Sequence, residues 1–324
     1  MTGTAIAHAL NRGLRDALAA DNKVLLLGED IGRLGGVFRV TAELQKDFGE
    51  SRVVDAPLGE AGIVGSAIGL AMAGYRPVCE IQFDGFTFPA MNQIVTQLAK
   101  YRHRSGGLVS LPVVIRIPVG GGIGAIEHHG ESPEAYFAHT AGLRVLSPST
   151  AQDAYDLIGQ AVRCDDPVVF LEPKRSYWRK GELDTAAQPS AMDSARVVRR
   201  GGDLTLVAYG ALVPIALEAA EALAEEGRDV EVVDLRSLSP VDDETVVESV
   251  RRTGRLVIAH EASRTAGLGG ELAARVQAAA FYSLEAPIVR VTGHDTPYPA
   301  ARLEADWLPN LDRILEGCDE SYAH

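Results

Sequence analysis

The chain alternates between short apolar runs rich in β-branched residues and longer stretches with helical periodicity. The runs in the N-terminal half are KVLLLGED, SRVVDAP, YRPVCEIQF, LPVVIRIP, LRVLSPS and DPVVFLEP. Each run precedes or follows a segment whose apolar residues recur at helical spacing, as in the N-terminal stretch MTGTAIAHALNRGLRDAL. Strands that alternate with helices are typical of a parallel sheet covered by helices. The pattern therefore predicts an α/β fold.

The alternation lapses between Lys174 and Asp203, where the chain is mixed and polar. It resumes with the strand-like runs LTLVAYG, DVEVVDLRSLSP, RLVIAHEA and PIVRVTG, separated by helical stretches such as ALVPIALEAAEALAEEG and VDDETVVESVRRTG. A chain of 324 residues also exceeds the usual size of one domain. We therefore predict two α/β domains, residues 1–190 and 191–324.

Composition narrows the classes of partner. The formal net charge of −13 disfavours nucleic-acid binding and would suit a basic protein partner. Cys79, Cys164 and Cys318 are far apart and show no CxxC spacing, so neither a disulfide framework nor a zinc site is indicated. No apolar run approaches the roughly 20 residues that span a bilayer, and the N-terminus lacks the pattern of a signal peptide. We expect a cytoplasmic protein with reduced thiols and without a membrane partner.

Glu60 is the single charged residue in PLGEAGIVGSAIGLAMAG, residues 57–74. A carboxylate in the first turn of a helix is stabilised by unpaired backbone N–H groups and by the helix dipole. The rest of the segment is apolar on every face, which predicts a helix buried on all sides. A carboxylate buried there needs a cationic neighbour or a bound group that shares its proton. The residues alone leave both interpretations open.

The segment GGGIGA at 120–125 formally fits the dinucleotide-binding pattern G-x-G-x-x-A. The context disfavours that function, because IEHHGES follows in place of an apolar helix and the next strand does not end in an acidic residue. His128 and His129 stand in the predicted loop, where adjacent histidines tend to point apart, so we expect at most one to serve a site. Ser132 and Pro133 resemble the N-cap and first position of a helix.

Seven segments, in order, carry a resemblance to a known family. They are VLLLGEDIG, PLGEAGIVGSAIGLAMAG, EIQFDGFTFPAMNQIVTQLAKYRHRSGG, PVVIRIPVGGGIG, ESPEAYFAHTAGLRVLSPST, DPVVFLEPKR and GHDTPYP. The chain resembles, over nearly its whole length, the β subunits of the thiamine diphosphate-dependent 2-oxoacid dehydrogenases. The resemblance implies two doubly wound α/β domains, an N-terminal pyrimidine-binding domain and a C-terminal domain of the transketolase type.

The resemblance also assigns roles to individual residues. Glu60 matches the glutamate that contacts N1′ of the cofactor's aminopyrimidine and promotes deprotonation of thiazolium C2. Phe86 matches the aromatic residue that packs against the pyrimidine, and Leu58 and Gln82 match positions beside it. His129 matches the histidine placed near the substrate and the incoming lipoyl group. Glu60 and His129 are thus the expected catalytic residues, and Leu58, Glu60, Gln82 and Phe86 the expected cofactor-binding residues.

Half of the cofactor site is missing from the sequence, because no Gly-Asp-Gly stretch with a later Asn is present to hold the metal and diphosphate. The resemblance implies that an α subunit supplies these ligands and magnesium in an α₂β₂ heterotetramer. It further implies docking of a lipoyl-bearing dihydrolipoyl acyltransferase core. Some relatives hold structural potassium on backbone carbonyls, which would here be those of Ala161, Cys164 and Asp166.

The implied reaction is the oxidative decarboxylation of a 2-oxoacid with reductive acylation of a lipoyl group. The segment HHGESPEAYFAH favours a branched-chain 2-oxoacid dehydrogenase, and pyruvate and acetoin dehydrogenase β subunits remain alternatives. A non-catalytic assembly subunit is the alternative from another class, but the positions of Glu60, Phe86 and His129 are all filled. A complete transketolase-like enzyme is disfavoured by the length of the chain and the missing metal motif.

Overall fold

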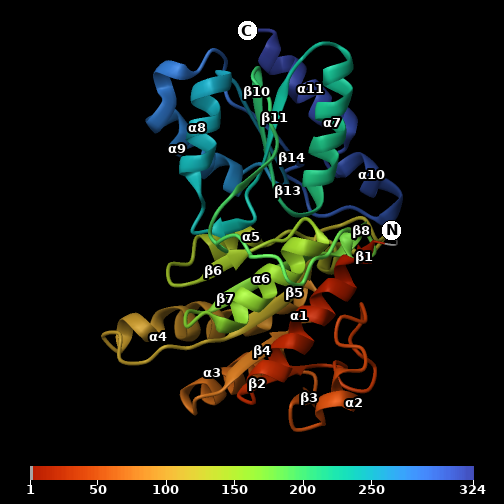
Figure 1. Ribbon diagram of the computed structural model, residues 1–324, viewed down its shortest axis with the longest axis vertical. Coiled ribbons are helices and arrows are strands. Elements are labelled where there is room, and N and C mark those ends of the chain that lie inside the picture. The colour runs from red at the N-terminus through yellow and green to blue at the C-terminus, as the bar shows by residue number, and fades with distance from the viewer. Residues whose placement is uncertain (1–2) are drawn as a thin grey trace. The chain divides into compact units, whose positions relative to one another are not determined.

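The computed structural model describes residues 3–324, which divide into two compact units (Figure 1). Unit 1 contains the residues up to Val119 and Tyr136–Met192, and unit 2 contains Gly120–Ala135 and Asp193–His324. The glycine-rich segment with its two histidines therefore has its contacts in unit 2. The chain returns to unit 1 within the short helix α5 (Glu134–Ala138).

Unit 1 is built on a parallel sheet. Its strands lie in the order β6 (Arg144–Leu146), β7 (Val168–Pro173), β5 (Val114–Val119), β4 (Arg76–Glu80), β2 (Val24–Gly28) and β3 (Val53–Asp55). A separate antiparallel ribbon pairs β1 (Thr4–Ala5) with β8 (Lys180–Gly181). The central strands are nearly continuous apolar runs, as expected where both faces of a parallel sheet are covered.

Helices α1 (Ile6–Ala20) and α6 (Ala151–Arg163) pack together in the main apolar cluster of unit 1. They approach so closely that a Cβ on Gly13 would come within 2.4 Å of Ile158. Helix α3 (Glu60–Met72) packs against β4, the 3₁₀ helix η1 (Asp84–Ala90) and the π-helix η2 (Asn92–Leu98). The remaining helical segments are α2 (Leu44–Phe48), α4 (Ala99–Arg104) and η4 (Lys174–Ser176).

Unit 2 contains a second sheet, in the order β14 (Val289–Gly293), β13 (Leu256–Ser263), β10 (Leu204–Ala208), β11 (Val230–Asp234) and β9 (Arg196–Arg199). The first four strands are parallel and β9 is antiparallel. Helices α7 (Val213–Glu225) and α11 (Leu311–Tyr322) cover one face, and α8 (Asp243–Thr253) and α9 (Leu268–Ala280) the other (Figure 1). Shorter elements are η3 (Glu127–His129), η5 (Gly210–Leu212), β12 (Ser237–Ser239), η6 (Phe281–Ser283), η7 (Ala301–Leu303) and α10 (Glu304–Trp307).

These elements confirm the predicted α/β fold, and each apolar run quoted from the sequence contains a strand. Strand β9 was not predicted, because it falls inside the mixed polar stretch and an edge strand needs little apolar surface. Helix α11, whose apolar stripe includes the buried Ile314 and Cys318, was not predicted either. Within residues 3–324, every helix falls short of the length and apolarity that a membrane crossing requires.

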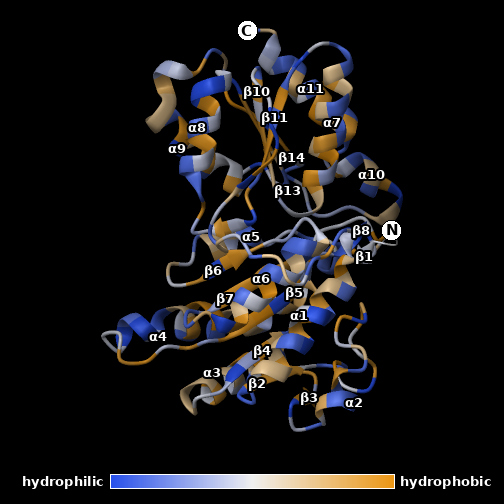
Figure 2. Cartoon of the chain, viewed as in Figure 1, coloured by the Kyte–Doolittle hydropathy of each residue, from blue (hydrophilic) through white to orange (hydrophobic). Residues whose placement is uncertain are grey.

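Helix α3 differs from its prediction. Figure 2 shows it in mostly hydrophobic colours, unlike the largely hydrophilic α4 and α8. One face is buried, and the other exposes Gly62, Ser66, Gly69 and Met72. A Cβ on Gly62 or Gly69 would meet no atom within 4 Å. The prediction of a helix buried on all sides is therefore wrong for this chain, which leaves a face of small residues uncovered.

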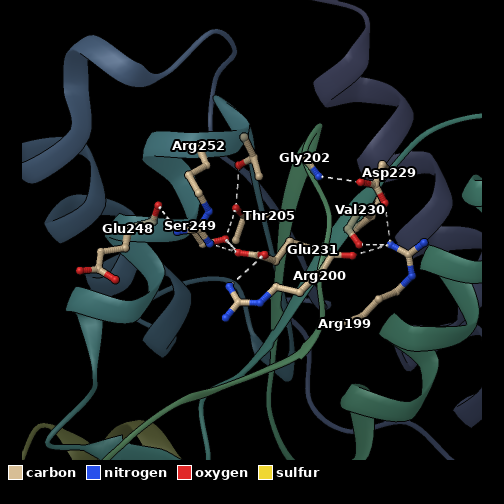
Figure 3. A network of polar contacts seen from close by, with 11 residues as sticks. Arg199, Arg200, Gly202, Thr205, Asp229, Val230, Glu231, Glu248, Ser249 and Arg252 are labelled. Atoms are coloured by element: carbon tan, nitrogen blue, oxygen red, sulfur yellow. Dashed lines mark hydrogen bonds and ion pairs between the residues drawn. The ribbon is translucent and has the colours of Figure 1, made fainter.

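A polar network lies at the beginning of β10 and β11 in unit 2 (Figure 3). The buried Glu231 accepts hydrogen bonds from Ser249 at 2.6 Å and from Arg252, and lies 3.6 Å from the guanidinium of Arg200. The Ser249 hydroxyl also lies 2.7 Å from that of Thr205. Glu231, the second residue of a buried strand, is thus surrounded by donors from α8 and by Arg200, which follows β9.

Candidate functional site

Three of the polar side chains of interest follow adjacent strands of the parallel sheet in unit 1. Gly28, the last residue of β2, pairs with Asp55 of β3 and Glu80 of β4, so these three strands end at the same level. Glu29 follows β2 directly, Glu60 follows β3 after a short loop, and Gln82 follows β4. Ligand sites of open parallel sheets lie at these carboxyl ends of the strands, which we call the sheet edge below.

Glu60 begins α3 and is half-buried. The preceding Gly59 has φ 155°, in the region that favours glycine, and lets the chain turn sharply from the loop into the helix. Burial, Asp30 and Glu60 together raise the pKa of Glu29 above its usual value. Glu29 therefore releases its proton at a higher pH than an exposed glutamate does.

Gln82 and Leu58, the other two residues expected beside the pyrimidine, differ in their surroundings. The amide of Gln82 donates a long hydrogen bond of 3.4 Å to Asp30, so its side chain reaches back over the end of β2. Leu58 is 78% exposed, although it is a large apolar residue. An exposed leucine next to the uncovered face of α3 indicates a surface that is incomplete in the single chain.

Phe86 lies on η1 and packs edge-to-face against Phe83, with ring centroids 6.0 Å apart. The helix that carries Phe86 is fixed by a buried ion pair, in which Lys174 lies 2.5 Å from Asp84. The same ammonium group lies 5.7 Å from the centroid of the Phe83 ring. The aromatic ring of Phe86 is therefore half-exposed on a firmly held support.

A buried ionic network that was not predicted from the sequence lies in the same sheet. The guanidinium of Arg116 on β5 donates to Glu172 on β7 at 2.7 and 2.9 Å and to Glu80 on β4 at 2.6 Å. Tyr177 donates to Glu172 at 2.5 Å. The pKa of Glu80 is raised, because burial outweighs the attraction of Arg116. Single charges inside the apolar runs VIRIPV and VVFLEP were the sequence signal for this network.

His128 and His129 end the single 3₁₀ turn η3 in unit 2. Their ring centroids lie 4.4 Å apart at an interplanar angle of 54°, so the prediction that the two histidines point apart is wrong. Consecutive side chains of a 3₁₀ turn diverge by about 120°, whereas those of an extended segment diverge by about 180°. Both histidines are half-buried, and Glu127 lies 3.6 Å from Nδ1 of His128. The structure thus brings them together as a pair.

Glu134 follows these histidines closely in the sequence and was not predicted to have a role. It begins α5, one residue later than the helix start predicted at Pro133. Burial raises its pKa to about 7, although Tyr209 donates a hydrogen bond of 2.6 Å to the carboxylate. The ring of Tyr209 stacks on His260, whose pKa is lowered to about 4 by burial. At about pH 5.5 both groups are therefore largely uncharged, whereas exposed counterparts would carry charge.

The carbonyls predicted to hold potassium lie at the end of α6. Arg76 donates to the carbonyl of Cys164 at 3.2 Å and to that of Val162 at 3.1 Å, and pairs with Asp165 at 2.5 Å. The carbonyl of Ala161 accepts a hydrogen bond from the backbone of Cys164 at 3.2 Å. A guanidinium cation thus already contacts one of the three predicted carbonyls, whereas Asp166 is engaged through its side chain by Arg102.

The chain matches two family models in sequence order. Residues 2–179 match the transketolase pyrimidine-binding domain, and residues 193–314 match the transketolase C-terminal domain. Among solved structures, it resembles a split gene transketolase described as an inactive β4 tetramer, with a TM-score of 0.82, 24% identity and 99% of both chains covered. At that identity the likeness supports the fold alone.

Curated relatives are much more similar in sequence. The chain is 63% identical to a pyruvate dehydrogenase E1 component subunit beta of Leifsonia xyli, with 98% of this chain and 95% of the relative covered. It is 53% identical to a 3-methyl-2-oxobutanoate dehydrogenase subunit beta of Mycobacterium tuberculosis, with 96% and 90% covered. It is 45% identical to a 2-oxoisovalerate dehydrogenase subunit beta of Pseudomonas aeruginosa, with 97% and 93% covered.

Proposed function

Because the chain belongs to the thiamine diphosphate-dependent family of 2-oxoacid dehydrogenase β subunits, we propose that it acts with an α subunit in the oxidative decarboxylation of a 2-oxoacid. The acyl group would then pass to a lipoyl group. One structural observation carries the proposal. Glu60 begins a helix whose face of small residues is uncovered. It lies at the carboxyl ends of the strands, together with Glu29, Gln82 and the 3₁₀ helix η1 that carries Phe86.

The residues at this edge fit half of thiamine diphosphate. A carboxylate that interacts with a second carboxyl group suits a protonatable ring nitrogen, and the half-exposed ring of Phe86 suits an aromatic face. Bound there, the cofactor supplies the nucleophilic carbon and the electron sink for decarboxylation. Glu60 would hold a proton at N1′, while Phe86, Gln82 and Leu58 would orient the pyrimidine.

The other half of the site would come from a partner. The uncovered face of α3 and the exposed Leu58 support docking of an α subunit in an α₂β₂ assembly, which would contribute the ligands of the diphosphate and magnesium. The lipoyl-bearing acyltransferase would be the third component, and His129 would assist acyl transfer to its dithiolane. Binding of potassium at the end of α6 stays a prediction, and Arg76 contacts one of the carbonyls expected to hold the ion.

Relatives of both substrate classes support the choice of assays. The histidine segment favours branched-chain substrates, whereas the relative at 63% identity is named for pyruvate. A panel of 3-methyl-2-oxobutanoate, pyruvate and acetoin, tested with an α chain that assembles with this one, will identify the substrate. Isolated β chain should bind thiamine diphosphate and magnesium weakly in calorimetry. Tight stoichiometric binding would contradict the divided site.

Glu60→Gln in the assembled enzyme tests the role of the carboxylate. The variant keeps size and hydrogen-bonding capacity, so the cofactor should still bind. Loss of a positioned proton-transfer group should slow deuterium exchange at C2 of the bound cofactor by roughly 10²–10⁴-fold. The exchange is measured by acid quench and NMR, with Glu50→Gln, which removes an exposed carboxyl group from unit 1, as the control. Normal exchange with a stability loss of about 0.3–1 kcal/mol would make Glu60 a helix-capping residue only.

The histidine pair is tested with lipoyl domains as acceptor. His129→Ala should slow reductive acylation more than decarboxylation measured with an artificial electron acceptor, and His128→Ala should do less. The two substitutions remove the same ring from adjacent positions of one turn, so each is the control for the other. Equal, small effects on acylation would show that neither histidine has the proposed role.

A further inference from the structure

The glycine-rich segment before the histidines is folded as a closed loop in unit 2. The backbone N–H of Gly120 donates to the carbonyl of Glu131 at 2.8 Å, which joins the two ends of the loop. Gly120, Gly122 and Gly124 have φ of 80°, 88° and 68°, in the region that favours glycine. Alternating left-handed residues turn backbone N–H groups toward a common side, where they can bind an anion.

Carboxylates of the same chain occupy these N–H groups. Glu304, the first residue of α10, accepts from Gly122 at 2.9 Å and from Gly124 at 3.0 Å. Glu261, near the end of β13, accepts from Gly121 at 2.5 Å. The donors that a phosphate would need are therefore engaged, which explains physically why the dinucleotide-like pattern GGGIGA does not describe a nucleotide site here.

Tyr298 contacts both ends of the loop, near Gly121 and near Gly130. Its hydroxyl donates to Glu304 at 2.5 Å. A Cβ on Gly121 would come within 1.8 Å of that hydroxyl oxygen, and a Cβ on Gly130 within 2.4 Å of the ring. Trp307 supports the ring from the side, with centroids 4.9 Å apart. The two glycines are thus required by the close approach of one aromatic residue.

Hydrogen bonding keeps Glu304 ionised. Partial burial would raise the pKa of its carboxyl group, but the bonds from Tyr298 and from the loop N–H groups outweigh burial and lower that pKa. The contacts span about 180 positions of sequence. The arrangement fixes the loop close to His128 and His129, since Gly130 follows them directly and its N–H donates to the carbonyl of Glu127 at 3.1 Å.

We propose that Tyr298 and Glu304 are positioning residues, which clamp the glycine-rich loop so that the pair His128 and His129 is presented in one fixed arrangement for acyl transfer. The proposal rests on the proposed function for its activity readout and on the loop geometry for its structural one. A histidine displaced by about 1 Å can lose up to roughly 10²-fold in rate. The clamp therefore matters most for the step that uses the histidines.

The experiment compares Glu304→Gln with Asp306→Asn in the α₂β₂ enzyme. Both variants remove one negative charge from α10, but the exposed Asp306 lies outside the loop contacts. Glu304→Gln should speed hydrogen exchange of the Gly122 and Gly124 amides at least tenfold and lower the rate of lipoyl acylation by about tenfold to a hundredfold. Decarboxylation with an artificial acceptor should change less than threefold. Asp306→Asn should leave all three unchanged.

Tyr298→Phe and Tyr298→Ala separate the contribution of the hydroxyl group from that of the ring. Phenylalanine keeps the ring against Gly121 and Gly130 but loses the donor to Glu304, so its effect should be smaller than that of alanine. Unchanged amide exchange in Glu304→Gln would overturn the clamp. Faster exchange with unchanged acylation would overturn its positioning role. If the parent enzyme lacks cofactor-dependent activity, the proposed function fails, while the exchange data still decide whether the clamp exists.

Discussion

Glu172 in unit 1 and Glu231 in unit 2 are both buried carboxylates that accept hydrogen bonds from arginine, but their partners differ. Arg116, which binds Glu172, has a side chain that is 2% exposed. Arg252 and Arg200, which face Glu231, have side chains that are 48% and 77% exposed (Figure 3). One network is enclosed by the protein, and the other opens to water on its cationic side.

The difference predicts how each network responds to the loss of a partner. In an enclosed network, removing the cation leaves carboxylates that water cannot reach, and the desolvation cost stays. In an open network, water replaces the lost guanidinium, and the pair contributes little. Burial of the arginine, more than burial of the glutamate, therefore decides the energetic importance of each contact.

The positions of the networks fit this difference. Glu80 is the last residue of β4 and Glu172 the last but one of β7, so the enclosed network lies toward the sheet edge that bears Glu60. Glu231 is the second residue of β11, at the opposite end of a parallel sheet. In parallel sheets the carboxyl end is the usual place of ligand sites. The enclosed network is thus placed to stiffen the site.

Arg116→Met should have the largest effect. It leaves Glu80 and Glu172 buried without their cation, and we expect unit 1 to lose about 3–5 kcal/mol. Urea denaturation followed by fluorescence can separate the units, because Trp178 lies in unit 1 and Trp307 in unit 2. Each unit is followed after the other tryptophan is replaced by phenylalanine. A loss below about 1 kcal/mol would show that water reaches the network.

Arg252→Gln should have an intermediate effect on unit 2. Glu231 keeps the bond from Ser249 and the nearby Arg200, and water can enter from the exposed side. We expect a loss of about 0.5–1 kcal/mol, measured by the fluorescence of Trp307 in urea. A loss as large as that of Arg116→Met would mean that exposure of the arginine does not decide the cost.

Glu80→Gln should have a smaller effect that depends on pH. The folded pKa of Glu80 is raised, so the folded state binds more protons than the unfolded state. That contribution is full at pH below the unfolded value of 4.5 and is lost as pH rises through the folded pKa. The variant, which cannot titrate, should gain stability relative to the parent as pH rises. Parallel curves from pH 4 to pH 8 would contradict the raised pKa.

Arg200→Gln should have the smallest effect. Its guanidinium is 77% exposed and lies 3.6 Å from Glu231, so the pair is screened by water and by salt. We expect a loss of about 0–0.5 kcal/mol at low ionic strength, which disappears in 1 M salt. Arg12→Gln, which removes an exposed ion pair with Asp16 in unit 1, is the matched control. A larger loss that persists in 1 M salt would show that Arg200 behaves like the enclosed Arg116.

Local pattern was enough for much of the site. The loss of charge after Glu60 and the regular small residues predicted a helix start at that carboxylate, and α3 begins there. The strand runs predicted β2, β3 and β4, but the pairing that brings the ends of these strands to one level was shown only by the structure. The uncovered face of α3 could not be predicted, because an apolar helix shows the same pattern whether its own chain or another subunit covers it.

The sequence by itself determined the alternation of strands and helices, the parallel sheets that follow from it, and the glycines and histidines of the loop. These features depend on periodicity and backbone preference, which act over a few residues. Only the tertiary structure decided which charges are enclosed and which carboxylate fills the loop. Arg116 meets Glu172 across 56 positions and Gly121 meets Glu261 across 140, and such pairings arise from packing of distant segments that no local pattern records.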